Sequence, residues 1–263
     1  MQTADEFLHA FHATHPGATD HAFRGGVLEG EGGSSYDLLA RFVATEAGGE
    51  VAMDLACGDG ALTARILEQP DPPAVVIGVD ASAAELKKAR KRIRRRAVFH
   101  NCPAQALPTP SGEVSAVGCH MALMLISPVE PVLDHVARVL VPGGALGAIV
   151  PSGLGGAGAV YLRLLAGHRS DRPPLGDARI RSEEGLRVLL SERFERVEVS
   201  DHVLSMEGTA ASLWSDVLST TYDVFALPEA EQEQLREAFL REVGGGAATM
   251  SMGLRFARAW TAR

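Results

Sequence analysis

The chain has 263 residues, of which 46% are hydrophobic and 22% are charged, and its net charge is −8. This balance is typical of a globular protein and excludes a disordered chain. The negative charge argues against a nucleic-acid substrate. No apolar run reaches the roughly 20 residues that cross a membrane. Three cysteines are too few for a disulfide framework.

Residues 1–45 are predicted to form a helical N-terminal cap. A short helix is expected over residues 4–12, then a break at His15-Pro16-Gly17, then a second helix over residues 34–44. Residues 1–15 show neither the basic start nor the apolar stretch of a secretory signal. The lack of a disulfide framework fits a reducing compartment, so we expect a cytoplasmic protein.

Histidines recur every third residue near the start of the chain, at His9, His12 and His15. Pro16-Gly17 interrupts the helix that would carry them, and no carboxylate or cysteine completes a ligand set. We therefore predict no metal site.

From residue 50 onward, short apolar strand patterns alternate with helical patterns. Strands are expected at residues 50–55, 74–79, 98–101, 114–119 and 145–150, and helices at residues 61–68, 83–95 and 129–140. This alternation indicates a parallel sheet with helices on both faces. Right-handed crossovers then give an α/β, Rossmann-like, doubly wound fold.

The last third of the chain mixes helical and strand patterns. Helices are expected within 153–167 and at 183–190, 210–225 and 229–243, and strands at 194–199 and 251–260 complete a mostly parallel sheet of seven strands. We expect residues 46–263 to form the core domain, with a helical lid insertion at about residues 201–248.

The strongest motif is Asp54-Leu55-Ala56-Cys57-Gly58-Asp59-Gly60, between the first core strand and its helix. The two glycines let the backbone approach a ligand closely, and the helix that follows offers free N–H groups at its positive end. A dinucleotide site has a third glycine where this chain has Thr63, which argues against a nicotinamide-dependent oxidoreductase. Asp80 ends the next strand, where a carboxylate can accept hydrogen bonds from both ribose hydroxyls.

These residues resemble motif I of the class I S-adenosylmethionine-dependent methyltransferases. Other matching pieces are Val79-Asp80, residues 104–108 (AQALP), the predicted strand at 114–119, and residues 137–144 (ARVLVPGG), which resemble the motif that follows in that class. The resemblance covers residues 50–150, and within the class the chain looks most like small-molecule enzymes of bacterial secondary metabolism. It implies S-adenosyl-L-methionine as the cofactor.

The resemblance also implies a role for each matching residue. Asp54 and the backbone of Ala56, Cys57, Gly58 and Gly60 would hold the methionine end of the cofactor. Asp80 would bind the ribose, and Cys119 and His120 would face the sulfonium. The adenine would lie beside Ala81, Ala104 and Gln105, and Tyr36 would help to cover the site. Many relatives have Asp where this chain has Pro103, so an adenine amine contact falls to Gln105, to Asn101 or to the backbone.

His120 ends the fourth predicted strand, at the sheet edge where ligands bind, and is the candidate base or substrate-orienting residue. Met121 and Met124 follow it and could line a substrate pocket, although core packing also explains them. Trp214 and Tyr222 lie in the expected lid and could contact substrate or simply pack between helices.

The sequence thus predicts an enzyme that methylates a small molecule, with no nucleic-acid or membrane partner. O-methylation is preferred because His120 offers a base, while N- or C-methylation, and a cofactor-binding protein with altered or lost chemistry, stay open. Monomer and homodimer are both open.

Eight of the ten residues from Lys87 to Arg96 are basic. Such a run could bind phosphate groups or RNA, but it has no interleaved aromatic residues and lies in an acidic protein. A solvated helix face is the favoured interpretation.

Overall fold

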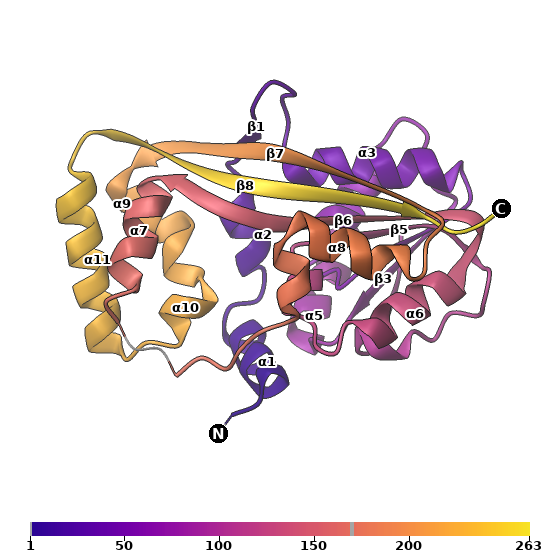
Figure 1. The fold of residues 1–263 in the computed structure, drawn as a ribbon, viewed down its shortest axis with the longest axis horizontal. Coiled ribbons are helices and arrows are strands. Elements are labelled where there is room, and N and C mark those ends of the chain that lie inside the picture. Colours follow the sequence, from indigo (N-terminus) through magenta and orange to yellow (C-terminus); the bar gives the residue numbers. More distant parts are fainter. Residues whose placement is uncertain (1, 169–170) are drawn as a thin grey trace. The chain divides into compact units, whose positions relative to one another are not determined.

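The computed structural model describes residues 2–168 and 171–263 (Figure 1). The chain forms two compact units, each assembled from three segments. The core unit consists of Tyr36–Pro151, Leu175–Asp201 and Arg255–Arg263. The helical unit consists of Met1–Ser35, Ser152–Pro174 and His202–Leu254.

The strands form one sheet in the order β1-β7-β8-β6-β5-β2-β3-β4. Its members are β1 (Val27–Leu28), β2 (Val51–Leu55), β3 (Val75–Asp80), β4 (Val98–Asn101), β5 (Val114–His120), β6 (Leu140–Gly156), β7 (Arg196–Thr209) and β8 (Ala247–Trp260). The neighbours among β2 to β6 pair in parallel, whereas β1 pairs with β7 antiparallel. The predicted mostly parallel Rossmann-like fold is confirmed, with an eighth, two-residue strand in addition to the seven expected.

Helices of the core unit connect these strands. They are α3 (Ser35–Ala47), α4 (Ala61–Leu67), α5 (Ala83–Ile93), α6 (Glu130–Val139) and α8 (Glu183–Ser191), with short 3-10 turns η1 (Ala104–Ala106), η2 (Leu123–Leu125) and η3 (Ala178–Arg181). Serine side chains cap α5 and α8: Ser82 Oγ accepts the N–H of Glu85, and Ser182 Oγ accepts the N–H of Gly185. These caps satisfy helix N–H groups that would otherwise lack partners.

Glycines in the sheet let α3 pack closely on it. Gly118 of β5 pairs in register with Gly147 of β6. A Cβ on Gly118 would lie 2.9 Å from a Val43 methyl, and one on Gly147 would lie 2.7 Å from the Phe42 ring. The position of α3, which carries Tyr36 near its start, therefore depends on these two missing side chains.

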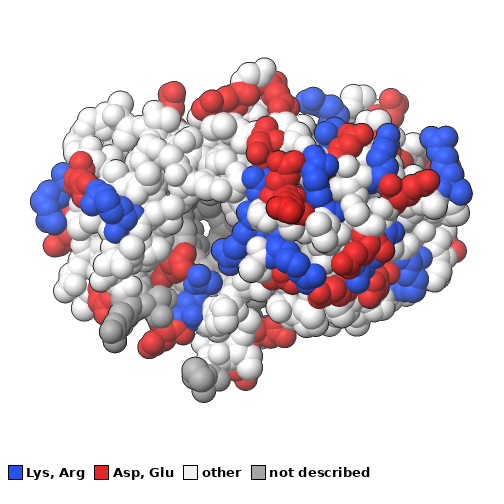
Figure 2. Space-filling model, viewed as in Figure 1, with Lys and Arg blue, Asp and Glu red and all other residues white. Residues whose placement is uncertain are grey.

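The other face of the sheet packs against α6 and α8. Val117 and Leu146 of the sheet form one buried cluster with Val136 of α6 and Leu186 of α8. On the outer side, acidic and basic side chains are interspersed over α6 and α8 (Figure 2).

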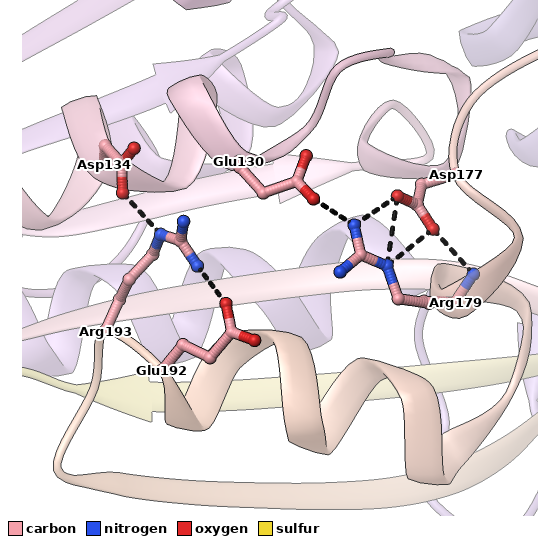
Figure 3. A network of polar contacts seen from close by, with 6 residues as sticks. All are labelled: Glu130, Asp134, Asp177, Arg179, Glu192 and Arg193. Atoms are coloured by element: carbon pink, nitrogen blue, oxygen red, sulfur yellow. Dashed lines mark hydrogen bonds and ion pairs between the residues drawn. The ribbon is translucent and has the colours of Figure 1, made fainter.

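Two arginines join these outer elements through carboxylates (Figure 3). Arg193 donates to Asp134 of α6 at 2.5 Å and to Glu192 at 2.8 Å. Arg179 of η3 is paired in the same way with Glu130 of α6 and with Asp177.

The helical unit contains α1 (Ala4–Thr14), α2 (Ala18–Phe23), α7 (Ala157–Leu165), α9 (Ala210–Asp216), η4 (Leu218–Thr220), α10 (Tyr222–Phe225) and α11 (Glu229–Val243). Aromatic rings hold it together. Phe11 of α1 packs against Tyr222 and Phe225 of α10, and Trp214 of α9 packs against Phe239 of α11. Among the described residues, no helix is long and apolar enough to cross a membrane.

The units divide the chain differently from the predicted boundaries. The predicted cap ended at residue 45, but α3 belongs to the core unit from Tyr36 on, because its apolar face packs on the sheet glycines. The helical unit also takes in residues 152–174, which the sequence placed in the core domain. A cap and a lid at the predicted limits stay a prediction.

Candidate functional site

The loop from β2 to α4 has a backbone that few residue types adopt. Ala56, Gly58 and Gly60 have φ values of 54°, 51° and 81°. A Cβ on Gly60 would lie 3.2 Å from the Cβ of Ala89, so this glycine also permits the close packing of α4 on α5. A Cβ on Gly58 would meet nothing nearer than Glu85 Oε2 at 4.0 Å, which leaves room beside this residue for a ligand.

Asp80 connects this loop to the end of β3. Its Oδ2 accepts the N–H of Gly58 at 2.8 Å, and its Oδ1 accepts the N–H of Ser82 at 2.7 Å. Asn101 supports the same strand end, since its Nδ2 donates to the carbonyls of Asp80 and Ala81 at 2.9 Å. The carboxylate predicted to bind a ribose thus lies directly beside the loop.

Asp54 lies beneath the loop and is 1% exposed. Thr63 of α4 donates its hydroxyl to Asp54 Oδ2 at 2.6 Å. Burial raises the pKa of Asp54 to about 7, and the nearby charges of Asp80 and Asp59 raise it further, against the lowering effect of Thr63. Asp54 is therefore tied to the start of α4 and has little surface with which to contact a ligand directly.

Four carboxylates therefore gather around the loop: Asp54, Asp59, Asp80 and Glu85. Asp59 and Glu85 are 7% and 3% exposed. Arg92 of α5 is paired with Asp59 at 2.7 Å. These acidic groups would favour a positively charged ligand over a phosphate at the loop.

His120, at the end of β5, stacks on Tyr36 of α3. The ring centroids are 3.9 Å apart with 25° between the planes, and each residue is 7% exposed. His120 lies two residues after Gly118 and therefore on the same face of the sheet, the face that α3 covers. The close approach of α3 thus brings the predicted base and the predicted covering residue together.

The remaining predicted residues of the core unit lie around these groups. Met121 is 8% exposed with a left-handed φ of 55°, and Met124 lies in η2 and is half-buried. Ala104 and Gln105 form part of η1, which follows β4. Cys119 is fully buried in the cluster against α6, and burial raises the pKa of its thiol to about 12. A ligand contact from Cys119 would therefore involve its backbone.

Two predicted substrate residues belong to the helical unit. Trp214 is 6% exposed and packs between Tyr161 and Phe239. The hydroxyl of Tyr222 lies 3.2 Å from His12 Nε2. Both side chains contribute to packing in this unit, and their contact with substrate stays a prediction.

Of the N-terminal histidines, His12 and His15 take part in that packing, and His15 stacks on Phe11 with the ring centroids 5.3 Å apart. Within residues 2–168 and 171–263, no group of three histidine, cysteine or acidic residues is arranged to hold a metal ion.

Residues 52–144, from β2 into β6, match the sequence profile of a family described as a methyltransferase domain. The chain contains a class I methyltransferase domain. The predicted resemblance is thereby confirmed, and S-adenosylmethionine is the cofactor of this class. The matched segment holds the loop, Asp80 and His120, so these residues of the candidate site lie within the methyltransferase domain.

Curated methyltransferases match part of this chain. A demethylmenaquinone methyltransferase of Thermus thermophilus is 35% identical over 114 residues, which cover 41% of this chain and 51% of the relative. The ubiquinone/menaquinone biosynthesis C-methyltransferase UbiE of Salmonella arizonae is 29% identical over 153 residues, 55% of this chain and 59% of the relative. The chain thus spans only about half the length of these relatives.

A solved structure extends the likeness of the fold to the whole chain. Phosphoethanolamine N-methyltransferase 2 of Haemonchus contortus, in complex with phosphomonomethylethanolamine and S-adenosylhomocysteine, superposes with a TM-score of 0.62. It is 15% identical, and the alignment covers 100% of this chain and 61% of that chain.

Sequence reasoning missed three charged residues and a hydroxyl at the site, and one of them, Glu85, was not singled out at all. Asp59 was part of the quoted motif but received no role, and Arg92 was grouped with the solvated basic run. Thr63 was noted only because it replaces a glycine. The sequence did offer one signal. Asp54 lies near the end of a predicted strand and Thr63 near the start of the next predicted helix, so a short loop between them places the two side chains close together.

Proposed function

We propose that this chain binds S-adenosylmethionine at the 54–60 loop and transfers its methyl group to a small-molecule acceptor. The observation that carries the proposal is the set of four carboxylates around the loop. S-adenosylmethionine bears a sulfonium and an ammonium group, so this site attracts it. The pyrophosphate of a nicotinamide dinucleotide would be repelled there.

The space beside Gly58 and the position of Asp80 support the same cofactor. Asp80 would bind the ribose, and the loop backbone would hold the methionine end. When bound, S-adenosylmethionine supplies a methyl group that its sulfonium charge already activates. The chain's own residues then need to hold an acceptor in line and keep water away.

His120 is suited to take a proton from the acceptor. A base that deprotonates a phenol-type hydroxyl raises the electron density on the oxygen and on the neighbouring ring carbons alike, so it can promote attack by either atom. Tyr36 covers the imidazole and limits its contact with water. These properties support a phenolic or quinol-type acceptor.

We propose a ring carbon as the attacking atom, because UbiE of Salmonella arizonae bears the name of a C-methyltransferase. The preference for O-methylation drawn from the sequence finds no support in these relatives. Cytoplasmic location and oligomeric state stay predictions.

Calorimetric titration tests the cofactor. S-adenosylmethionine and S-adenosylhomocysteine are expected to bind, and NAD is expected not to bind. Binding of NAD alone would overturn the proposal.

Methyl transfer is tested with cofactor that carries a deuterated methyl group. The acceptors are a naphthoquinol with an open ring position, a phenol whose ortho and para positions are blocked, and a primary amine. Mass spectrometry and NMR are expected to find the label on carbon in the naphthoquinol. Label on the oxygen of the blocked phenol would support O-methylation instead. Cofactor binding without any transfer would favour a protein with altered or lost chemistry.

The role of His120 is tested with His120→Ala. Its kcat is expected to fall by about 100-fold, as is typical for loss of a general base, while cofactor affinity changes little. Equal losses in kcat and in cofactor affinity would assign His120 a structural role.

A further inference from the structure

Arg92, a basic residue of α5, forms an ion pair with the 54–60 loop. Arg92 Nη2 donates to Asp59 Oδ2 at 2.7 Å, and the side chains of Arg92 and Asp59 are 31% and 8% exposed. The preceding residue, Lys91, is exposed and takes part in no ion pair among the described residues. Arg92 is thus distinguished from its neighbour by its contact and not by its charge.

The position of Asp59 in the loop makes this contact important. It lies between Gly58 and Gly60, both in left-handed conformations. Glycine has many accessible backbone conformations when unfolded, so fixing two of them carries a large entropic cost. Backbone hydrogen bonds such as Gly60 N–H to the Cys57 carbonyl, at 2.9 Å, fix part of the loop. Arg92 fixes the residue between the two glycines.

Arg92 also offsets negative charge. The carboxylates of Asp59 and Asp80 both act on Asp54 and raise its pKa. Without Arg92, Asp59 would lose this ion pair at a largely buried position whose charge acts on Asp54, and the loop would be held less firmly.

We propose that Arg92 is a positioning residue for the cofactor, acting through its ion pair with Asp59 to hold the 54–60 loop in its binding conformation. This inference rests on the proposed function, because its consequence is measured as affinity for S-adenosylmethionine. Arg92 is thereby assigned to the cofactor site and not to the solvated face of the basic run.

The test is a double-mutant cycle with S-adenosylmethionine and S-adenosylhomocysteine as the probes. Arg92→Ala is expected to raise both dissociation constants by about tenfold, the scale of one charge-assisted hydrogen bond, and Asp59→Asn is expected to raise them as well. The double variant is expected to bind no more weakly than the weaker single variant, because the pair acts as a unit. Lys91→Ala removes the same charge and is expected to bind as the wild type does.

Two further measurements separate positioning from general destabilisation. Arg92→Lys keeps the charge and is expected to recover part of the affinity. The pH at which affinity is half-maximal is expected to move upward in Arg92→Ala, because removing a cation favours protonation of Asp54 beside Asp59 and Asp80. Neither effect would follow from a purely structural role. If Arg92→Ala does not fold, Arg92→Lys and Asp59→Asn carry the test.

The outcomes distinguish this inference from the proposed function. Wild-type binding, with equal affinities for Arg92→Ala and Lys91→Ala, would overturn the role of Arg92 alone. Additive losses in the double variant would also overturn it. Absence of binding by the wild-type chain would overturn the proposed function, and this inference with it.

Discussion

At the scale of single residues, Asp54 lies in an environment that disfavours the ionised form of its carboxyl group. It is almost fully buried, the hydroxyl of Thr63 donates one hydrogen bond to it, and the charges of Asp80 and Asp59 act against its ionisation. A cationic ligand nearby would favour the ionised form. Ligand binding and ionisation of Asp54 are therefore expected to promote each other.

A pH-dependent loss of stability is expected from Asp54. An aspartate ordinarily has a pKa of 3.8, the value expected in the unfolded chain, whereas the pKa of Asp54 in the folded protein is about 7. Between these pH values the folded state holds a proton that the unfolded state has lost, so the free energy of unfolding falls as the pH rises from about 4 to about 7, by up to about 4 kcal/mol.

Chemical denaturation of the ligand-free chain and of Asp54→Asn across this pH range measures the effect. The variant has no carboxyl group at this position and is expected to lose less stability as the pH rises. Parallel curves for the two proteins would show that Asp54 does not titrate in this range.

Ala56 is the one non-glycine residue of the loop with a left-handed backbone, at φ 54°. For alanine this conformation costs roughly 1 kcal/mol or more, and glycine avoids that cost. Ala56→Gly is therefore expected to raise the melting temperature by about 2 °C in a chain of this size. Ala64→Gly, in the interior of α4, is the matched control and is expected to lower it. A lower melting temperature for both variants would contradict the argument.

Residues of the site differ in how far sequence alone could identify them. Gly58, Gly60 and Asp80 follow directly from local patterns, because a strand end and a glycine turn bring them together. The contact between Asp59 and Arg92 joins residues 33 positions apart. It depends on how α5 packs against the start of α4 at Gly60, and no local pattern reveals that packing.

At the scale of elements, the sheet glycines set the position of α3 and with it the stack of Tyr36 on His120. Each missing side chain leaves space that the helix fills, so the pairing of Gly118 with Gly147 has a direct consequence for the site. Packing of this kind tolerates little added volume.

Gly118→Ala is expected to lower the free energy of unfolding by about 1–3 kcal/mol, because the new methyl group would lie within 3 Å of Val43 and Leu62. Displacement of α3 is also expected to loosen the ring stack and shift the NMR signals of His120. Gly245→Ala serves as the control, since a Cβ there meets nothing within 4 Å. Equal effects of the two substitutions would show that α3 does not depend on Gly118.

Prediction of the elements from sequence succeeded where periodicity was strong. The helix at 229–243 and the strand at 98–101 have the predicted limits. The strand predicted at 145–150 runs from Leu140 to Gly156 in β6, because the Pro- and Gly-containing stretches at both its ends have few of the β-branched and aromatic residues that mark a strand. The two-residue β1 was missed, since its pairing with β7 supplies what its short pattern cannot.

At the scale of the whole molecule, the segment that matches the methyltransferase family is not the whole of the core unit. Strand β8 lies between β6 and β7 in the sheet, and residues 175–201 supply α8. The buried cluster against α6 includes Leu186 and Leu189 of α8.

A fragment of residues 36–151 is therefore expected not to fold, although it contains every residue proposed to bind the cofactor. It would expose β6 as a sheet edge and lose the apolar cover of α8. Circular dichroism on heating is expected to show no cooperative transition for the fragment and a clear one for the full chain. Cooperative unfolding of the fragment would contradict this expectation.

The helical unit is built from three separate stretches of the chain. Two of them interrupt the core unit, between residues 151 and 175 and between residues 201 and 255. No single crossover could therefore exchange this unit between two such proteins. A chimera that borrows a relative's helices would need five junctions, while the cofactor loop between residues 54 and 60 would be inherited intact.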